Sequence, residues 1–187
     1  MKHHSRRLLN RAVFVLFWGL LLPALIVHAQ SRLSDDPGFV DLGAVEQWFE
    51  DAPTLEVDIR GRLLHLVAEA SRLDDPELSV LLGKLKAIQV RGYSLRHSQF
   101  DDIARHASAF ARRLSEDGWH TVLHVRERGE QTDMYVRMNH DEIAGMMVMV
   151  IEPGYDDTVF LNIVGNIDPE QIGRLGRKFD LGHLDDF

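Results

Sequence analysis

Histidine, arginine and tyrosine side chains gather in two neighbouring segments of the chain, where they could donate hydrogen bonds to an anion. They are His120, His124, Arg126, Tyr135 and Arg137. Tyrosine and arginine are enriched where proteins bind partners. The group is locally basic in a chain whose formal net charge is −8. We therefore predict that it forms a binding surface for an anionic ligand or a partner protein.

The histidines do not make a predicted metal site. His120 and His124 are expected on one strand, where four residues span roughly 13 Å, whereas zinc holds each ligand at about 2.1 Å. Asp102 and His106 have helical spacing, but the sequence offers them no third ligand. Most methionines lie within residues 134–149, where thioethers could bind copper(I), yet their alternation favours core packing. We predict no metal and no cofactor.

Motifs for nucleophilic or phosphate chemistry are missing from the sequence. It contains no cysteine, which excludes disulfides, thiolate metal sites, a cysteine nucleophile and a lipidated cysteine. It has no Gly-x-Ser-x-Gly elbow and no Gly-x-Gly-x-x-Gly loop. Adjacent acids at 74–75 and 156–157 fall at turns, where aspartate is structurally favoured. We predict no catalytic residues, and the acidic balance disfavours nucleic-acid binding.

Residues 1–29 have the features of an export signal. The basic residues that open this segment are Lys2, Arg6, Arg7 and Arg11. An uncharged apolar stretch follows, and Val27-His28-Ala29 suits a signal peptidase, so we expect cleavage before Gln30. An uncleaved anchor is the alternative, although a spanning helix needs about 20 apolar residues. The paired arginines also fit twin-arginine export, but the strongly apolar stretch favours the Sec route. Either route places the protein in the periplasm or outside the cell.

A predicted hairpin positions the candidate binding residues. With a turn at Gly129-Glu130, Leu123 faces Val136 on one side, and His124 faces Tyr135 on the other. The first side is mostly apolar and the second is polar. Because the apolar side must be buried, we expect helices to cover it and to leave the polar side open.

Periodicity and end signals predict the remaining elements. Further strands are expected at 55–59, 86–95, 143–151 and 158–164. Helices are expected at 42–49, at 63–73, after Asp75-Pro76-Glu77, at 99–117 and from Asp168 onward. Ser98 with Asp101 resembles a capping box for the long helix, and Gly118 is placed to end it. The apolar stripe predicted for the last helix consists of Ile172, Leu175 and Phe179.

These elements predict an α+β domain. Consecutive strands joined by short turns must be antiparallel neighbours, so we expect a mostly antiparallel twisted sheet with helices packed on one face. The predicted organisation is a signal peptide (1–29), a polar leader (30–41), a single α+β domain (42–181) and a C-terminal tail (182–187).

Three segments carry a resemblance to a known family: the strand Leu55–Ile59, the strand Leu85–Val90, and the strand-to-helix junction Phe160–Asp168. With the exported N-terminus, they make residues 42–181 resemble domain-of-unknown-function family 4252, a family of small exported bacterial proteins. The resemblance implies no catalytic residues. It implies a place near extracytoplasmic-function sigma-factor systems, and hence a role in the cell envelope.

The predicted function is that of a soluble, exported cell-envelope protein, a non-enzymatic binding module that uses its open sheet face. The expected partner is an unknown envelope protein or an anionic ligand. Nucleic acid is not expected, and the membrane is involved only if the signal segment stays uncleaved. Two alternatives stay open: an accessory of extracytoplasmic sigma-factor envelope-stress signalling, and an enzyme of unrecognised type. An enzyme needs a concave pocket with converging titratable groups.

Overall fold

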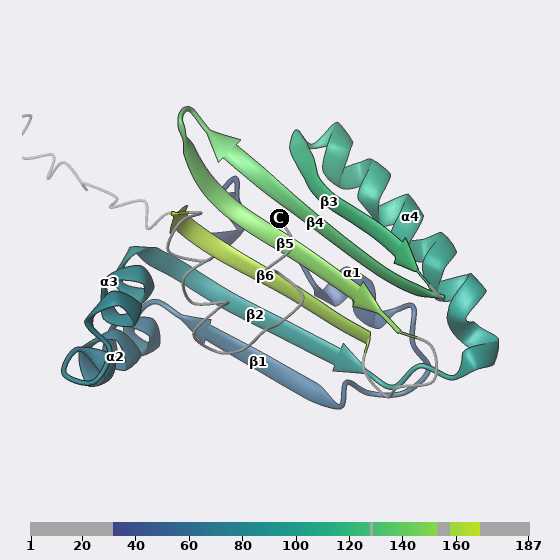
Figure 1. The fold of residues 1–187 in the computed structure, drawn as a ribbon, viewed down its shortest axis with the longest axis horizontal. Coiled ribbons are helices and arrows are strands. Elements are labelled where there is room, and N and C mark those ends of the chain that lie inside the picture. Colours follow the sequence, from purple (N-terminus) through teal and green to yellow (C-terminus); the bar gives the residue numbers. More distant parts are fainter. Residues whose placement is uncertain (1–31, 128, 153–157, 169–187) are drawn as a thin grey trace, which may run out of the picture. The chain divides into compact units, whose positions relative to one another are not determined.

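The structure, a computed structural model, describes residues 32–127, 129–152 and 158–168 (Figure 1). The predicted signal segment and the predicted last helix and tail lie outside the described residues. Within the described residues, no helix combines the length and the apolar character needed to cross a membrane.

One antiparallel sheet of six strands organises the described chain, in the order β1-β2-β6-β5-β4-β3. The last four strands are neighbours in chain order, as predicted, and β2 joins them through β6. The strands are β1 (Leu55–Arg60), β2 (Leu85–Tyr93), β3 (Trp119–Glu127), β4 (Glu130–Asn139), β5 (Glu142–Ile151) and β6 (Thr158–Ile167). The helices are α1 (Gly43–Glu46), α2 (Arg62–Ser71), α3 (Pro76–Lys84) and α4 (Phe100–Glu116).

Local signals explain where α3 and α4 begin and end. The Asp75 side chain accepts a hydrogen bond from the Leu78 amide at 3.2 Å, which caps α3 in front of Pro76. Gly118 has a φ of +81°, the left-handed conformation that ends α4. The predicted capping box at Ser98 is wrong. A short 3-10 turn over residues 97–99 leads into α4, so Gln99 becomes the N-cap and makes no side-chain cap.

The β3–β4 register differs from the prediction. Glu127 pairs with Glu130, and His124 pairs with Asp133 instead of Tyr135. The turn lies one residue earlier than predicted because Gly129 adopts a φ of +89°, as two-residue hairpin connections favour. An irregularity between Thr121 and Leu123 shifts the pairing again. It places His120 opposite Val136, on the other side of the sheet from His124.

Helices lie against both faces of the sheet, whereas the sequence predicts them on one. On the first face, which we call the covered face, α1 and α4 pack into a core with Tyr93, Tyr135, Met147, Met149 and Phe160. On the second, the apolar face, α2 and α3 pack through Leu64 and Leu82 onto Met146 and Ile167. Figure 1 shows α2 and α3 side by side at one end of β1 and β2. The α+β class and the antiparallel sheet are confirmed.

Residues 38–42 cross the covered face and are fastened there by the buried side chain of Asn162. Asn162 Oδ1 accepts a hydrogen bond from the Val40 amide at 3.0 Å, and its Nδ2 donates to the Gly38 carbonyl at 3.0 Å. Gln89 Nε2 also donates to Asn162 Oδ1, at 3.2 Å. A Cβ on Gly38 would lie only 2.0 Å from the Ala144 carbonyl oxygen, so this close approach requires glycine.

Aromatic rings then anchor the segment that follows α1. Phe49 stacks on Tyr93, with ring centroids 4.0 Å apart and planes 3° from parallel. Trp48 meets Phe110 and Phe160 edge-on, at 5.5 and 5.6 Å. Such contacts add to the burial of large apolar surface. Residues 38–49 therefore form part of the core.

The apolar stripe of α4 can be tested by substitution. Phe110 is buried on the covered face, so Phe110→Ala should lower the free energy of unfolding by about 3–5 kcal/mol. Arg113 is exposed on the same helix, and Arg113→Ala should change it by less than about 0.5 kcal/mol. Chemical denaturation of both variants beside the wild type measures the difference. Equal effects would contradict the packing of α4.

Candidate functional site

The structure divides the predicted binding residues between the two faces of the sheet and buries part of the face expected to be open. His124 and Arg126 lie on the covered face, while His120 lies on the apolar face. Tyr135 is only 3% exposed, within the core formed with α1 and α4. The expectation of an open polar side is therefore wrong at Tyr135, whereas His124 and Arg126 on the edge strand β3 stay exposed. The polar side also carries Met147, Met149 and Phe160 from its neighbouring strands, and these apolar side chains draw helices onto it.

Polar side chains on β3 and β4 satisfy one another within the covered face. Asp133 is 1% exposed. One of its carboxylate oxygens contacts His124 Nδ1, and the other accepts a hydrogen bond from Gln131 Nε2 at 2.6 Å. Arg126 donates to the Gln131 amide oxygen. The cluster brings His124 and Arg126 together, and its donors satisfy the buried carboxylate of Asp133.

The arginines of the covered face also have internal partners. Arg137 donates to the Gly118 carbonyl at 2.7 Å and so ties β4 to the end of α4. Arg91 is buried and pairs with Glu56 at 3.0 Å and with Glu46 at 3.4 Å. Sequence reasoning missed Arg91, because alternation along β2 places it on the side opposite Ile88 and Val90 and gives no signal of burial. These arginines hold elements together within the fold.

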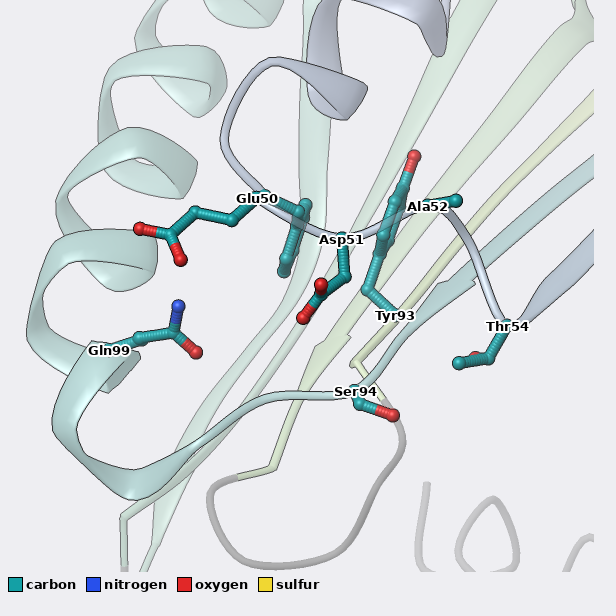
Figure 2. A pocket seen from close by; sticks show the side chains of 8 residues that line it. Glu50, Asp51, Ala52, Thr54, Tyr93, Ser94 and Gln99 are labelled. Atoms are coloured by element: carbon teal, nitrogen blue, oxygen red, sulfur yellow. The ribbon is translucent and has the colours of Figure 1, made fainter.

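A cavity of about 230 Å³ opens beside the end of β2 (Figure 2). Its lining residues are Phe49, Glu50, Asp51, Ala52, Thr54, Tyr93, Ser94 and Gln99. In Figure 2 the Glu50 carboxylate and the Gln99 amide face each other, while the Tyr93 hydroxyl points away from Ser94 and Gln99. The volume is below the range of about 300–1,000 Å³ typical of small-molecule sites. The cavity is therefore smaller than a typical small-molecule site.

The apolar face carries a surface that sequence reasoning missed. One row of directly paired residues crosses the whole sheet, and every member is apolar and half-buried. From edge to edge, the row consists of Val57, Val90, Leu161, Val148, Met134 and Leu123. The sequence does contain a signal for this surface, because β5 and β6 carry apolar residues on both of their sides. A strand with two apolar sides needs cover on both.

The described helices cover only part of this face. Buried contacts of α2 and α3 reach Met146 and Ile167, at the end of the sheet where β2 begins. A further row, beyond Leu161, includes the half-buried pair Val150 and Val159. Neither valine belongs to a core cluster that the described residues form. The row at Val159 therefore lies beyond that core, whereas Val148 and Met134 in the row at Leu161 still pack against its edge.

Two tyrosines on the covered face are held in their neutral form. Burial raises the pKa of Tyr135 to about 12, and the negative charge of Asp133 adds to the effect. Burial, helped by Glu46, also raises the pKa of Tyr93 to about 12. A buried phenol resists losing its proton because the phenolate is poorly solvated there.

Among the described residues, no group of three or more histidine or acidic side chains is arranged to hold a metal ion.

Alkaline titration tests the burial of these two rings. Their folded-state pKa values exceed the ordinary value near 10, so their contribution to stability is complete below about pH 10 and is lost as the pH rises toward 12. In a Tyr155→Phe background, phenolate absorbance at 295 nm should appear only as the fold is lost. Phenolate formation near pH 10 with an unchanged circular dichroism spectrum would contradict the assignment. Tyr93→Phe with Tyr135→Phe should remove this alkaline step.

Comparison with known proteins places the chain in a family. No match is found among curated proteins or among solved structures. The profile of the family described as Domain of unknown function (DUF4252) matches residues 49–175. The match contains all three segments from which the sequence predicts this resemblance. The chain belongs to the DUF4252 family.

Proposed function

We propose that the chain is an exported, non-enzymatic binding module of the cell envelope, and that it binds a partner protein through the apolar face of its sheet. The basic and apolar features of residues 1–29 support export. The half-buried apolar rows support binding. The proposal keeps the predicted class of function but moves the binding surface to the opposite side of the sheet.

The continuous row from Val57 to Leu123 is the observation that carries the proposal. Neighbouring strands lie about 4.8 Å apart, so a row across six strands is on the order of 24 Å wide. Soluble proteins seldom leave apolar patches of several hundred Å² exposed unless something binds them. A surface of this width and composition suits an apolar or amphipathic segment of another protein. Each Å² of apolar area removed from water contributes about 25 cal/mol.

The charges of the covered face argue for binding over catalysis. Arg91, Asp133 and Arg137 are all engaged in contacts inside the fold. Catalysis requires titratable groups that converge on a substrate-sized cavity. The cavity in Figure 2 is small, and its lining contains the carboxylates of Glu50 and Asp51 without a histidine or a cationic side chain. Binding through shape and apolar contact needs no such groups.

The test replaces two valines that share the apolar face. Val150→Thr with Val159→Thr keeps the branched shape that β-strands favour and adds two hydroxyls at a cross-strand pair. Burying unpaired hydroxyls against a partner costs roughly 1–3 kcal/mol each. We expect at least a tenfold loss of partner adduct from a photocrosslinking residue at Leu161, in the native host, because tenfold is about 1.4 kcal/mol.

A matched pair of substitutions controls for the added hydroxyls. Val67 on α2 and Val80 on α3 are exposed and lie outside the apolar rows, so Val67→Thr with Val80→Thr should leave adduct yield unchanged. Thermal unfolding of both double variants establishes that each is folded. Equal adduct yields from the two variants would overturn the assignment of the binding surface.

A further inference from the structure

Helix α2 carries a second apolar side, which points away from the sheet. Its inward side packs through Leu64 and Ala68 onto the apolar face. On the outward side, Leu63, Leu66 and Leu73 are 49%, 66% and 89% exposed, and the last two are the most exposed large apolar side chains in the described part of the chain. We infer that this outward side binds α2 of a second copy of the chain, in an antiparallel pair with two-fold symmetry.

The exposed residues have the spacing of a seam between two helices. They are separated by three, four and three positions, as the a and d residues of a heptad are. We call them the outer stripe: Leu63, Leu66, Ala70 and Leu73. α2 ends at Ser71, but the Asp75 amide donates to the Ser71 carbonyl at 2.7 Å, so a helical turn continues past Leu73. At 3.6 residues per turn, the outer stripe lies nearly opposite Leu64 and Ala68.

Charged side chains on one flank of the outer stripe make it complementary to a second copy. Arg62 and Glu69 are both exposed and lie seven positions apart, about two helical turns, so they share that flank. A two-fold axis beside the middle of α2 sets two copies antiparallel and brings the same flank of each together. Arg62 at the start of one helix then lies beside Glu69 near the end of the other. The symmetry makes this contact twice.

Arg62 is available for such a contact. It has no ion-pair partner among the described residues, whereas the nearby Arg60 pairs with Asp58. Glu69 pairs with Arg72 at 3.4 Å, but both side chains of that pair are exposed. An exposed pair of this kind contributes little stability. Glu69 can therefore also receive Arg62 of the second copy.

The charges around the outer stripe favour a second copy over a lipid surface. An amphipathic helix that binds anionic lipid is rich in lysine and arginine beside its apolar side. Here Glu69 and Asp74 accompany Arg62 and Arg72, so the rim carries both signs of charge. An anionic membrane would repel the acidic residues. A second copy of the same rim, turned round by the two-fold axis, presents opposite charges instead.

This association goes beyond the proposed function and does not rest on it. The outer stripe lies on the far side of α2 from the apolar face, so a dimer leaves that face free. Stable interfaces bury roughly 600 Å² or more on each copy, and the outer stripe spans only about three helical turns. We therefore expect a weak, reversible dimer.

Charge reversal tests the contact between Arg62 and Glu69. Sedimentation velocity of the protein purified from its native host should show a reversible dimer at up to about 100 μM, a range that captures weak interfaces. Arg62→Glu alone and Glu69→Arg alone should each raise the dimer dissociation constant at least about tenfold, because like charges then meet. An equimolar mixture of these two variants should associate again, because both contacts regain opposite charges.

Arg112→Glu on the exposed side of α4 makes the same change of charge away from the outer stripe, and it should leave the dissociation constant unchanged. Circular dichroism establishes that every variant is folded. A wild type that stays monomeric would overturn the inference. So would a mixture that associates no better than either single variant.

A single thiol locates the contact. The chain has no cysteine, so Leu66→Cys introduces one at the middle of the outer stripe, beside the two-fold axis. A disulfide requires Cα atoms within about 7 Å of each other, and mild oxidation should therefore link two copies of this variant. Val122→Cys is the matched control, because Val122 is 58% exposed on β3, and it should stay unlinked. Equal yields of linked dimer would mean random collision and would overturn the inference.

Flotation with phospholipid vesicles separates a second copy from a lipid surface. With vesicles of phosphatidylethanolamine and phosphatidylglycerol, we expect the wild type to stay in the soluble fraction. Flotation of a wild type that sediments as a monomer, abolished by Leu63→Gln with Leu66→Gln, would overturn the inference in favour of a membrane surface. Neither result depends on a partner adduct at Leu161, so failure of the dimer and failure of the binding module are distinguishable.

Discussion

The buried amide of Asn162 holds the architecture of the covered face together. It binds the backbone at Gly38 and at Val40, more than a hundred residues earlier in the chain, and it also accepts a hydrogen bond from Gln89. A buried amide left without partners costs free energy, so the crossing segment and the sheet stabilise each other. With residues 38–42 in place, α1 and the rings of Trp48 and Phe49 pack beside them. That arrangement covers the first face of the sheet. On the apolar face, the described helices that pack against the sheet are α2 and α3.

The sheet therefore buries its polar side and leaves part of its apolar side accessible. This arrangement is possible because the buried polar groups find partners: Asp133 binds His124 and Gln131, and Arg91 binds Glu56. A buried polar group that is hydrogen-bonded carries little penalty. The half-buried valines and leucines of the apolar face cannot be stabilised by hydrogen bonds in this way. Only contact with another apolar surface removes them from water. That asymmetry is why function is assigned to the apolar face.

Local features of the fold could be predicted from the sequence, and the pairing of distant features could not. Period-two alternation predicted β1 and β2, and the Asp75-Pro76 signal predicted α3. The β3–β4 register was missed because it depends on the conformation at Gly129 and on the irregularity near Thr121. Alternation assigns residues to two sides of a strand but does not say which side a helix covers. The candidate site residues were therefore predicted on one open surface, whereas the structure divides them between the two faces of the sheet. The contact of Asn162 with Gly38 left no local signal in the sequence.

The closure of the covered face is the central claim, and hydrogen exchange at the Val40 amide tests it most directly. This amide donates to Asn162 Oδ1 at 3.0 Å in a buried position. Native-state exchange, followed residue by residue by NMR, should show Val40 exchanging as slowly as the central amides of β6, through global unfolding alone. Fast exchange at Val40 while the amides of β6 stay protected would mean that residues 38–42 leave the sheet readily. The covered face would then be open to other molecules, and the assignment of function to the apolar face would fail.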